Sequence, residues 1–171
     1  MDSRFAVFFF IMGGLDTYLN DCPTDCAQQS DAPARISLQA SETYFQREVI
    51  GEEIYATYDL PTRYGAFQPT FGASLTNDDD FWIGAGGKWT TERVAGGPIF
   101  IELSLMPGLY VRGDGPDLGF PLQFRGALGA GVKLGDTSSL TVFFDHRSNA
   151  NATELNPGIE TLGIRYSYTF Q

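Results

Sequence analysis

The sequence is poor in several residue types that mark common functional classes. Its 171 residues include one histidine, two cysteines, and eleven lysines and arginines against 21 aspartates and glutamates. The formal charge of −10 argues against nucleic-acid binding, because phosphates require clustered lysine and arginine. Cys22 and Cys26 lack the second Cys or His pair that a structural zinc site needs, so a short local disulfide is the plain interpretation.

Long apolar runs are also missing, which excludes a helical membrane protein. The 43% apolar content is nevertheless sufficient for one folded domain. Twenty glycines, fourteen phenylalanines and eight tyrosines, with few helix-forming stretches, favour an all-β chain with tight turns and aromatic bands.

The N-terminal segment has the features of a secretory signal. Arg4 precedes an apolar stretch from Phe5 to Leu15, although no Ala-x-Ala cleavage site follows. The stretch 28–35 is polar and contains Pro33. We therefore expect residues 1–33 to form a signal-like N-terminal tail with the Cys pair, and residues 34–171 to form the folded domain.

Alternation of apolar and polar residues dominates the chain from residue 34 onward. Turn signals rich in glycine, proline and aspartate separate the alternating segments. The predicted strands are 35–44, 50–60, 66–76, 81–91, 99–112, 119–134, 140–148 and 160–170. Eight strands of about ten residues match a small transmembrane β-barrel.

Alternation alone fits two kinds of barrel. A soluble lipocalin-type barrel turns its apolar face inward around a ligand, whereas an outer-membrane barrel turns it toward lipid. Opposite charges on the polar faces, such as Glu102, Arg125, Lys133 and Arg165, can pair in a narrow lumen, and the last strand is aromatic up to Phe170. These features favour an eight-stranded antiparallel transmembrane β-barrel in the outer membrane.

The last two predicted strands carry a group of chemically useful side chains. His146 and Ser148 end one apolar face, and Glu160 begins the next after the loop 149–157. A hairpin would bring these three residues together in the arrangement that acyl transfer needs. His146 is the sole histidine, so a base acting near neutral pH would have to be this one. The alternative is that all three are ordinary polar residues at the membrane interface.

The runs His146–Ala150 and Asn156–Glu160 (HRSNA and NPGIE) resemble the lipid A 3-O-deacylase family of Gram-negative outer membranes. Met106–Tyr110 and Phe124–Gly126 are similar to its preceding strands, so the resemblance covers about residues 50–171. It implies a hydrolase site on the lipid-facing exterior of the barrel. By this resemblance, residues 34–171 would be a β-barrel hydrolase domain.

The resemblance also implies a role for each motif residue. Ser148 would be the nucleophile, His146 the general base, Glu160 the acid that orients the histidine, and Asn156 the oxyanion donor, with Asn149 as a second candidate. The expected substrate is lipid A of lipopolysaccharide, no metal or organic cofactor is required, and a homodimer is compatible with this interpretation. The alternatives are a non-catalytic structural or adhesive barrel and a broader outer-membrane phospholipase or esterase.

Overall fold

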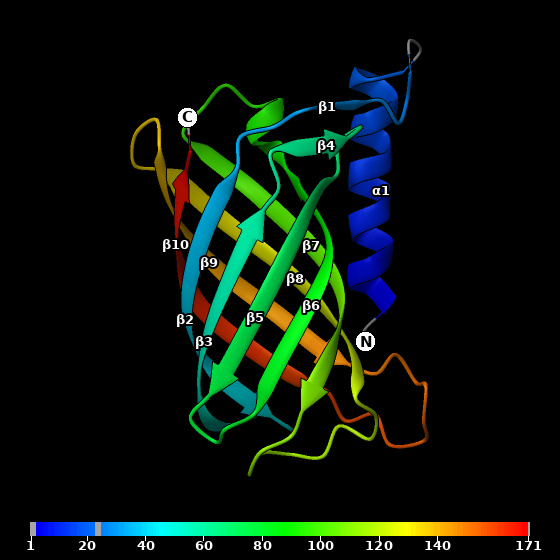
Figure 1. Cartoon of the computed structure of the whole chain (residues 1–171), viewed down its shortest axis with the longest axis vertical. Coiled ribbons are helices and arrows are strands. Elements are labelled where there is room, and N and C mark those ends of the chain that lie inside the picture. The colour runs from blue at the N-terminus through cyan, green and yellow to red at the C-terminus, as the bar shows by residue number, and fades with distance from the viewer. Residues whose placement is uncertain (1–2, 23–24, 171) are drawn as a thin grey trace.

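The computed structural model describes residues 3–22 and 25–170, and within them eight antiparallel strands close a barrel (Figure 1). Around the barrel the strands follow the order β10-β2-β3-β5-β6-β7-β8-β9, so β9 and β10 are neighbours. Their bounds are β2 (Arg35–Phe45), β3 (Glu48–Asp59), β5 (Gln68–Thr76), β6 (Phe81–Thr90), β7 (Ile99–Val111), β8 (Leu122–Lys133), β9 (Ser138–Ser148) and β10 (Ile159–Thr169). The predicted all-β barrel is confirmed.

The apolar faces of the strands point outward, which excludes the lipocalin-type alternative. Large apolar side chains on the exterior are about half exposed, among them Leu38 at 56%, Ile83 at 50% and Ile164 at 55%. An exterior of this kind is the lipid-facing surface of a membrane barrel. We call it the outer wall.

The lumen is filled by paired charges. Arg125 lies at its centre, where Nη2 donates to Glu53 at 2.6 Å and to Asp145 at 2.9 Å. Farther along the lumen, Arg165 pairs with Glu102 at 3.1 Å. Burying these charges is tolerable because each faces an opposite charge. Of the four residues predicted for the lumen, Lys133 lies at its mouth, with its side chain 37% exposed and 4.0 Å from Glu92.

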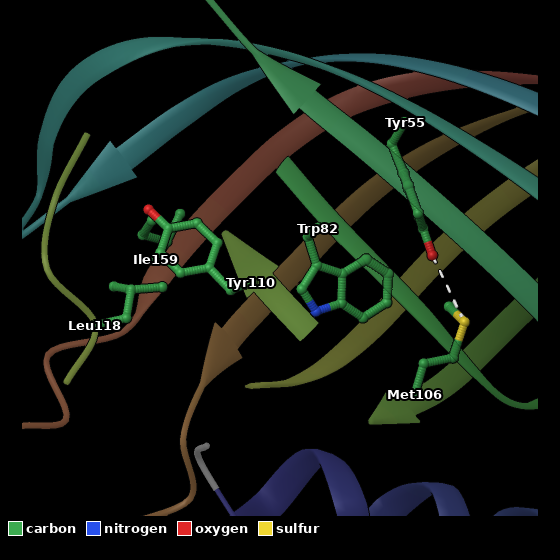
Figure 2. Close-up of a cluster of buried hydrophobic side chains, with 6 residues drawn as sticks. All are labelled: Tyr55, Trp82, Met106, Tyr110, Leu118 and Ile159. Atoms are coloured by element: carbon green, nitrogen blue, oxygen red, sulfur yellow. Dashed lines mark hydrogen bonds between the residues drawn. The ribbon is translucent and has the colours of Figure 1, made fainter. Parts of the chain in front are cut away.

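An apolar cluster fills the lumen at the end where β9 ends and β10 begins. It comprises Tyr55, Trp82, Met106, Tyr110, Leu118 and Ile159, which Figure 2 shows gathered inside the barrel. Glycines make room for the Trp82 indole, since a Cβ on Gly84 or Gly108 would lie 2.5 or 2.6 Å from its ring. Through Leu118, the cluster includes a residue of the connection between β7 and β8.

In the described part of the chain, three short elements and one helix lie outside the barrel strands. Helix α1 (Ser3–Asn20) lies against the outer wall, and β1 (Gln29–Asp31) pairs with β4 (Thr62–Tyr64) near the end of the barrel where the chain enters and leaves it (Figure 1). The 3₁₀-helix η1 (Thr91–Arg93) follows β6. No helix in the described part of the chain is long and apolar enough to cross a membrane.

The segment predicted as a signal-like tail contains helix α1 and strand β1. The predicted disulfide between Cys22 and Cys26 is present, directly after α1. The first barrel strand begins at Arg35, close to the predicted start of the folded domain at residue 34. Residues 1, 2, 23, 24 and 171, which belong to the two predicted segments, lie outside the described residues.

Candidate active site

His146 and Glu160 lie side by side on the outer wall. They are direct cross-strand partners in the β9–β10 ladder, and His146 Nδ1 is 3.7 Å from Glu160 Oε1. The His146 side chain is 15% exposed and that of Glu160 is 46% exposed. The separation is longer than a hydrogen bond, but catalytic hydrogen bonds are often long before substrate binds. The predicted pairing of base and acid therefore has a basis in the register of the hairpin.

Gly158 determines which way the imidazole can lie. A Cβ at Gly158 would be 2.7 Å from His146 Cε1 and 3.2 Å from Nε2, so the ring rests directly over this glycine. The β9–β10 ladder ends at the pair Ile159–Arg147, so Gly158 comes directly before the first paired residue of β10. The imidazole thus turns Nδ1 toward Glu160 and its Cε1–Nε2 edge toward Gly158.

Ser148 is the last residue of β9 and is almost completely buried, with 1% of its surface exposed. Its partner in the neighbouring strand β8 is Phe124. Among the described residues, the Ser148 hydroxyl oxygen has no hydrogen-bond partner. A buried hydroxyl without a partner carries a free-energy cost and is a common feature of functional sites. A substrate ester can reach this oxygen only when the side chains around it move aside.

Asn149 and Asn156 hold the loop between β9 and β10. The Asn149 side chain is fully buried, and its Nδ2 lies 3.0 Å from the Leu118 carbonyl oxygen and 2.7 Å from that of Leu155. It also lies 3.0 Å from Thr153 Oγ1, so both amide hydrogens have acceptors. Asn149 therefore acts as a structural anchor in this conformation.

Asn156 has more freedom to bind a ligand. Its Oδ1 accepts a hydrogen bond from the Asn149 backbone N–H at 2.9 Å, and its Nδ2 donates to Asn151 Oδ1 at 2.8 Å. An amide nitrogen carries two hydrogens, and no described residue takes the second. Of the two asparagines predicted as oxyanion donors, Asn156 is thus the one whose amide has a hydrogen that no described residue accepts.

The wall beside the pair is apolar. Phe144 and Leu162, the next pair on the same face, are 40% and 47% exposed. Leu162 also borders a groove of about 800 Å³ that opens over β2 and neighbouring strands. The apolar lining of this groove includes Ile54, Leu75, Val142, Leu162 and Ile164. A hydrocarbon chain matches such a surface.

Two further residues shape the site although the alternation pattern did not single them out. Gly126 is the partner of His146 in β8, and Leu118 supplies the carbonyl oxygen that anchors Asn149. Gly126 belongs to the run Phe124–Gly126 that resembles the family, but only the three-dimensional structure reveals that it pairs with His146 and that Leu118 contacts Asn149. Among the described residues, no group of three or more His, Cys, Asp or Glu side chains could hold a metal ion.

An eight-stranded barrel with an apolar outer wall and a charged lumen defines the chain as an outer-membrane β-barrel. The model of one family, lipid A 3-O-deacylase (PagL), matches residues 54–169, which is more than half of the chain and includes every predicted site residue. The chain therefore belongs to the lipid A 3-O-deacylase family. A search of curated proteins gave no significant match.

Solved structures of outer-membrane barrels share the fold. The crystal structure of the outer-membrane enzyme PagL aligns with a TM-score of 0.62 and 21% identity, covering 78% of this chain and 97% of that one. Neisserial surface protein A aligns with a TM-score of 0.59 and 9% identity over 84% and 99% of the two chains. A de novo designed transmembrane β-barrel gives 0.58 and 10% identity, again over 84% and 99%. At these sequence identities, the similarity to the solved structures shows a shared fold and nothing further.

Proposed function

We propose that this protein hydrolyses the ester-linked 3-hydroxyacyl chain at the 3 position of lipid A. The observation that carries the proposal is the His146–Glu160 pair on the outer wall, 3.7 Å apart and two residues from Ser148, within the segment that matches the family. Ester hydrolysis needs a nucleophile, a base and a group that orients the base. Ser148, His146 and Glu160 supply these three in order.

In the first half of the reaction, Ser148 Oγ attacks the ester carbonyl carbon while His146 Nε2 takes the hydroxyl proton. Glu160 faces Nδ1 and stabilises the imidazolium that forms. The tetrahedral intermediate then expels the sugar oxygen, which receives the proton from His146. The product of this half is an acyl group on Ser148.

In the second half, His146 takes a proton from water, and the resulting hydroxide attacks the acyl-serine carbonyl. Collapse of the second intermediate releases a 3-hydroxy fatty acid and returns the proton to Ser148 Oγ. Asn156 Nδ2 donates to the oxyanion in both intermediates, an interaction typically worth about 3 to 4 kcal/mol. The mechanism requires neither a metal nor an organic cofactor.

The position of the site suits a substrate that stays in the membrane. The long connections 112–121 and 149–158 lie at the same end of the barrel as His146, and longer loops of such barrels are extracellular. Lipid A in the outer leaflet would present its sugar-proximal ester at this level. Its acyl chain would lie along the apolar wall, in the groove bordered by Leu162.

The proposal is tested by the lipid A mass profile of cells that express the protein. Wild type should remove one 3-hydroxyacyl chain, and Ser148→Ala or His146→Ala should abolish this loss while the barrel still inserts. Ser167→Ala is the matched control, because it also removes a serine hydroxyl group, but from the buried lumen face of β10.

Each other outcome removes part of the proposal. Unchanged lipid A with a properly inserted wild-type barrel would favour a structural or adhesive protein. Release of fatty acid from phospholipids at a rate similar to that from lipid A would favour a broader phospholipase or esterase. Activity that survives both substitutions would remove the triad.

A further inference from the structure

Asp80 holds one end of the connection between β7 and β8, although it belongs to the connection between β5 and β6. It is buried, with 3% of its surface exposed, whereas the preceding Asp79 is exposed. Asp80 Oδ1 accepts hydrogen bonds from the backbone N–H groups of Gly113 at 2.7 Å and Gly115 at 3.3 Å. A Cβ at Gly115 would overlap the carboxylate, so the turn closes directly around it. Such donors are what a buried carboxylate needs to be stable, and here the connection 112–121 supplies them.

The middle of the same connection is fixed inside the barrel. Leu118 is buried in the apolar cluster of the lumen, where Figure 2 shows it. Tyr110 of that cluster donates a hydrogen bond from its hydroxyl to the Pro116 carbonyl oxygen at 3.1 Å. The connection 112–121 is therefore held both at the turn around Asp80 and at Leu118.

The connection then contacts the loop 149–158 of the candidate site. The Leu118 carbonyl oxygen accepts a hydrogen bond from Asn149 Nδ2 at 3.0 Å. The next carbonyl oxygen, that of Gly119, accepts one from Thr153 Oγ1 at 3.4 Å. Two successive carbonyl groups of one connection thus bind side chains of the other.

These contacts reach the candidate oxyanion donor, Asn156. Its Oδ1 accepts a hydrogen bond from the Asn149 backbone N–H at 2.9 Å, so the position of Asn149 influences that of the Asn156 amide. At Gly119, a Cβ would overlap the carbonyl oxygen of Leu155, the residue before Asn156. Asp80 is therefore linked to Asn156 by a continuous set of close contacts.

From these contacts we propose that Asp80 is a positioning residue of the candidate site. It fixes the turn at 113–115, and this turn places the Leu118 and Gly119 carbonyl groups against the loop 149–158. The loop in turn holds the Asn156 amide in one direction. The effect of Asp80 on catalysis rests on the proposed hydrolysis, whereas its effect on the loop does not.

Hydrogen exchange of the full-length, detergent-solubilised protein tests the effect on the loop without lipid A. Asp80→Ala should raise the exchange rate of the peptide 149–158 roughly tenfold, because it leaves two backbone N–H groups without their acceptor. Asp80→Asn keeps an oxygen at the same position and should restore slow exchange. Asp114→Ala is the matched control, because it removes an exposed carboxylate from the same turn.

Kinetics test the consequence for the proposed hydrolysis. Asp80→Ala should lower kcat roughly tenfold and leave KM for lipid A nearly unchanged, because an oxyanion donor acts on the intermediates rather than on the bound ester. In an Asn156→Asp background the same substitution should have no further effect, since the donor that it positions is absent. Asp80→Asn should restore kcat.

Gly119→Ala tests the same contact from the other side, including the case in which Asp80→Ala does not insert. Its methyl group would push the loop 149–158 away from the connection, so exchange of the loop should rise as in Asp80→Ala. Gly135→Ala is the control, because Gly135 also has a positive φ but has nothing within 4 Å of its Cβ position.

Slow exchange of the loop 149–158 in a folded Asp80→Ala or Gly119→Ala protein would overturn the proposal. So would equally fast exchange in Asp80→Ala and Asp114→Ala, or the same loss of kcat with and without the Asn156 amide. A wild type that is inactive on lipid A would remove the proposed hydrolysis, and the exchange rates would still decide whether Asp80 positions the loop.

Discussion

The imidazole of His146 has a carboxylate on one side and a glycine on the other. Glu160 faces its Nδ1, and Gly158 lies beneath its Cε1 and Nε2. Gly158 also has a φ of +74°, a backbone conformation that side chains with a Cβ rarely adopt. One residue thus serves both the turn into β10 and the orientation of the base.

Gly158→Ala is expected to reduce the deacylation rate more than it reduces stability. The φ value costs about 1–2 kcal/mol for a residue with a Cβ, and the methyl group would push the imidazole away from Glu160. Deacylation kinetics and thermal unfolding of the detergent-solubilised protein measure the two effects. Gly96→Ala is the control, because nothing lies within 4 Å of its Cβ position. Full activity of Gly158→Ala would contradict the assigned ring orientation.

Asn156→Asp tests the oxyanion donor with an isosteric change. It keeps the oxygen that accepts from the Asn149 N–H but removes the amide donor, so kcat should fall by roughly 10²–10³. The control, Asn151→Asp, keeps an oxygen for the Asn156 amide and should retain activity. A normal rate for Asn156→Asp would assign the donor elsewhere.

Among the secondary-structure elements, the sequence predicts the long barrel strands better than the short strands and the segments that pack against the barrel. Period-two alternation over 35–44 or 140–148 predicts both a strand and its outward face, because the pattern follows directly from strand geometry. Lengths of three residues, as in β1 and β4, are too short to give such a pattern. The burial of Ser148 could not be predicted either, because alternation indicates on which face of a strand a side chain lies but not which residues cover that side chain.

The pairing of His146 with Glu160 was predictable for the same reason. Alternation and a single loop place His146, Ser148 and Glu160 together, and the motifs associate them with a known family. The docking of α1 was not predictable, because the apolar stretch from Phe5 to Leu15 fits a leader and a packed helix equally well. The contacts of α1 with the barrel, such as the hydrogen bond from Trp89 to Asp16, appear only in three dimensions.

Asp16 of α1 accepts hydrogen bonds from Trp89 and Arg93, so the packing of α1 on the barrel in the full chain should depend on pH. Burial acts to raise the pKa of this carboxyl, but hydrogen bonds from Arg93, Trp89 and Asn20 outweigh it and hold the pKa below its ordinary value of 3.8. A lowered folded-state pKa stabilises docking above pH 3.8, and this stabilisation is lost as the pH falls through the folded value.

Limited proteolysis of α1 between pH 7 and pH 2.5 measures this effect. Protection of the helix should be constant at higher pH and decline below about 3.8, the ordinary carboxyl value. In Asp16→Asn, which has no carboxyl to titrate, protection should be weaker at pH 7 and nearly independent of pH. A wild-type helix that remains equally protected at the lowest pH would show that Asp16 does not control docking.

In the whole molecule, the residues that stabilise the barrel and the residues of the candidate site lie on opposite faces of the barrel wall. The charges that hold the lumen together, such as Glu53, Arg125 and Asp145, point inward, whereas the candidate triad belongs to the outer wall. Arg147 adds a second contact to Glu53 at 3.2 Å. Substitutions on the two sides should therefore have separable effects.

Glu53→Ala should destabilise the barrel strongly, because it leaves Arg125 and Arg147 without their shared carboxylate. Removing one partner of a buried ion pair typically costs about 3–5 kcal/mol. Urea unfolding measured by heat-modifiable gel mobility reports this loss. The fraction that remains folded should deacylate lipid A at the wild-type rate per folded molecule. A large loss of specific activity with unchanged stability would place part of the chemistry in the lumen.

The most direct test of the account is the identity of the serine that becomes acylated. The purified, folded protein is treated with a long-chain alkyl fluorophosphonate, and the modified peptide is identified by mass spectrometry. We predict one adduct, on Ser148, which disappears in His146→Ala and is unchanged in Ser167→Ala. An adduct on another residue, or an active wild-type protein that forms none on Ser148, would contradict a serine nucleophile on the outer wall.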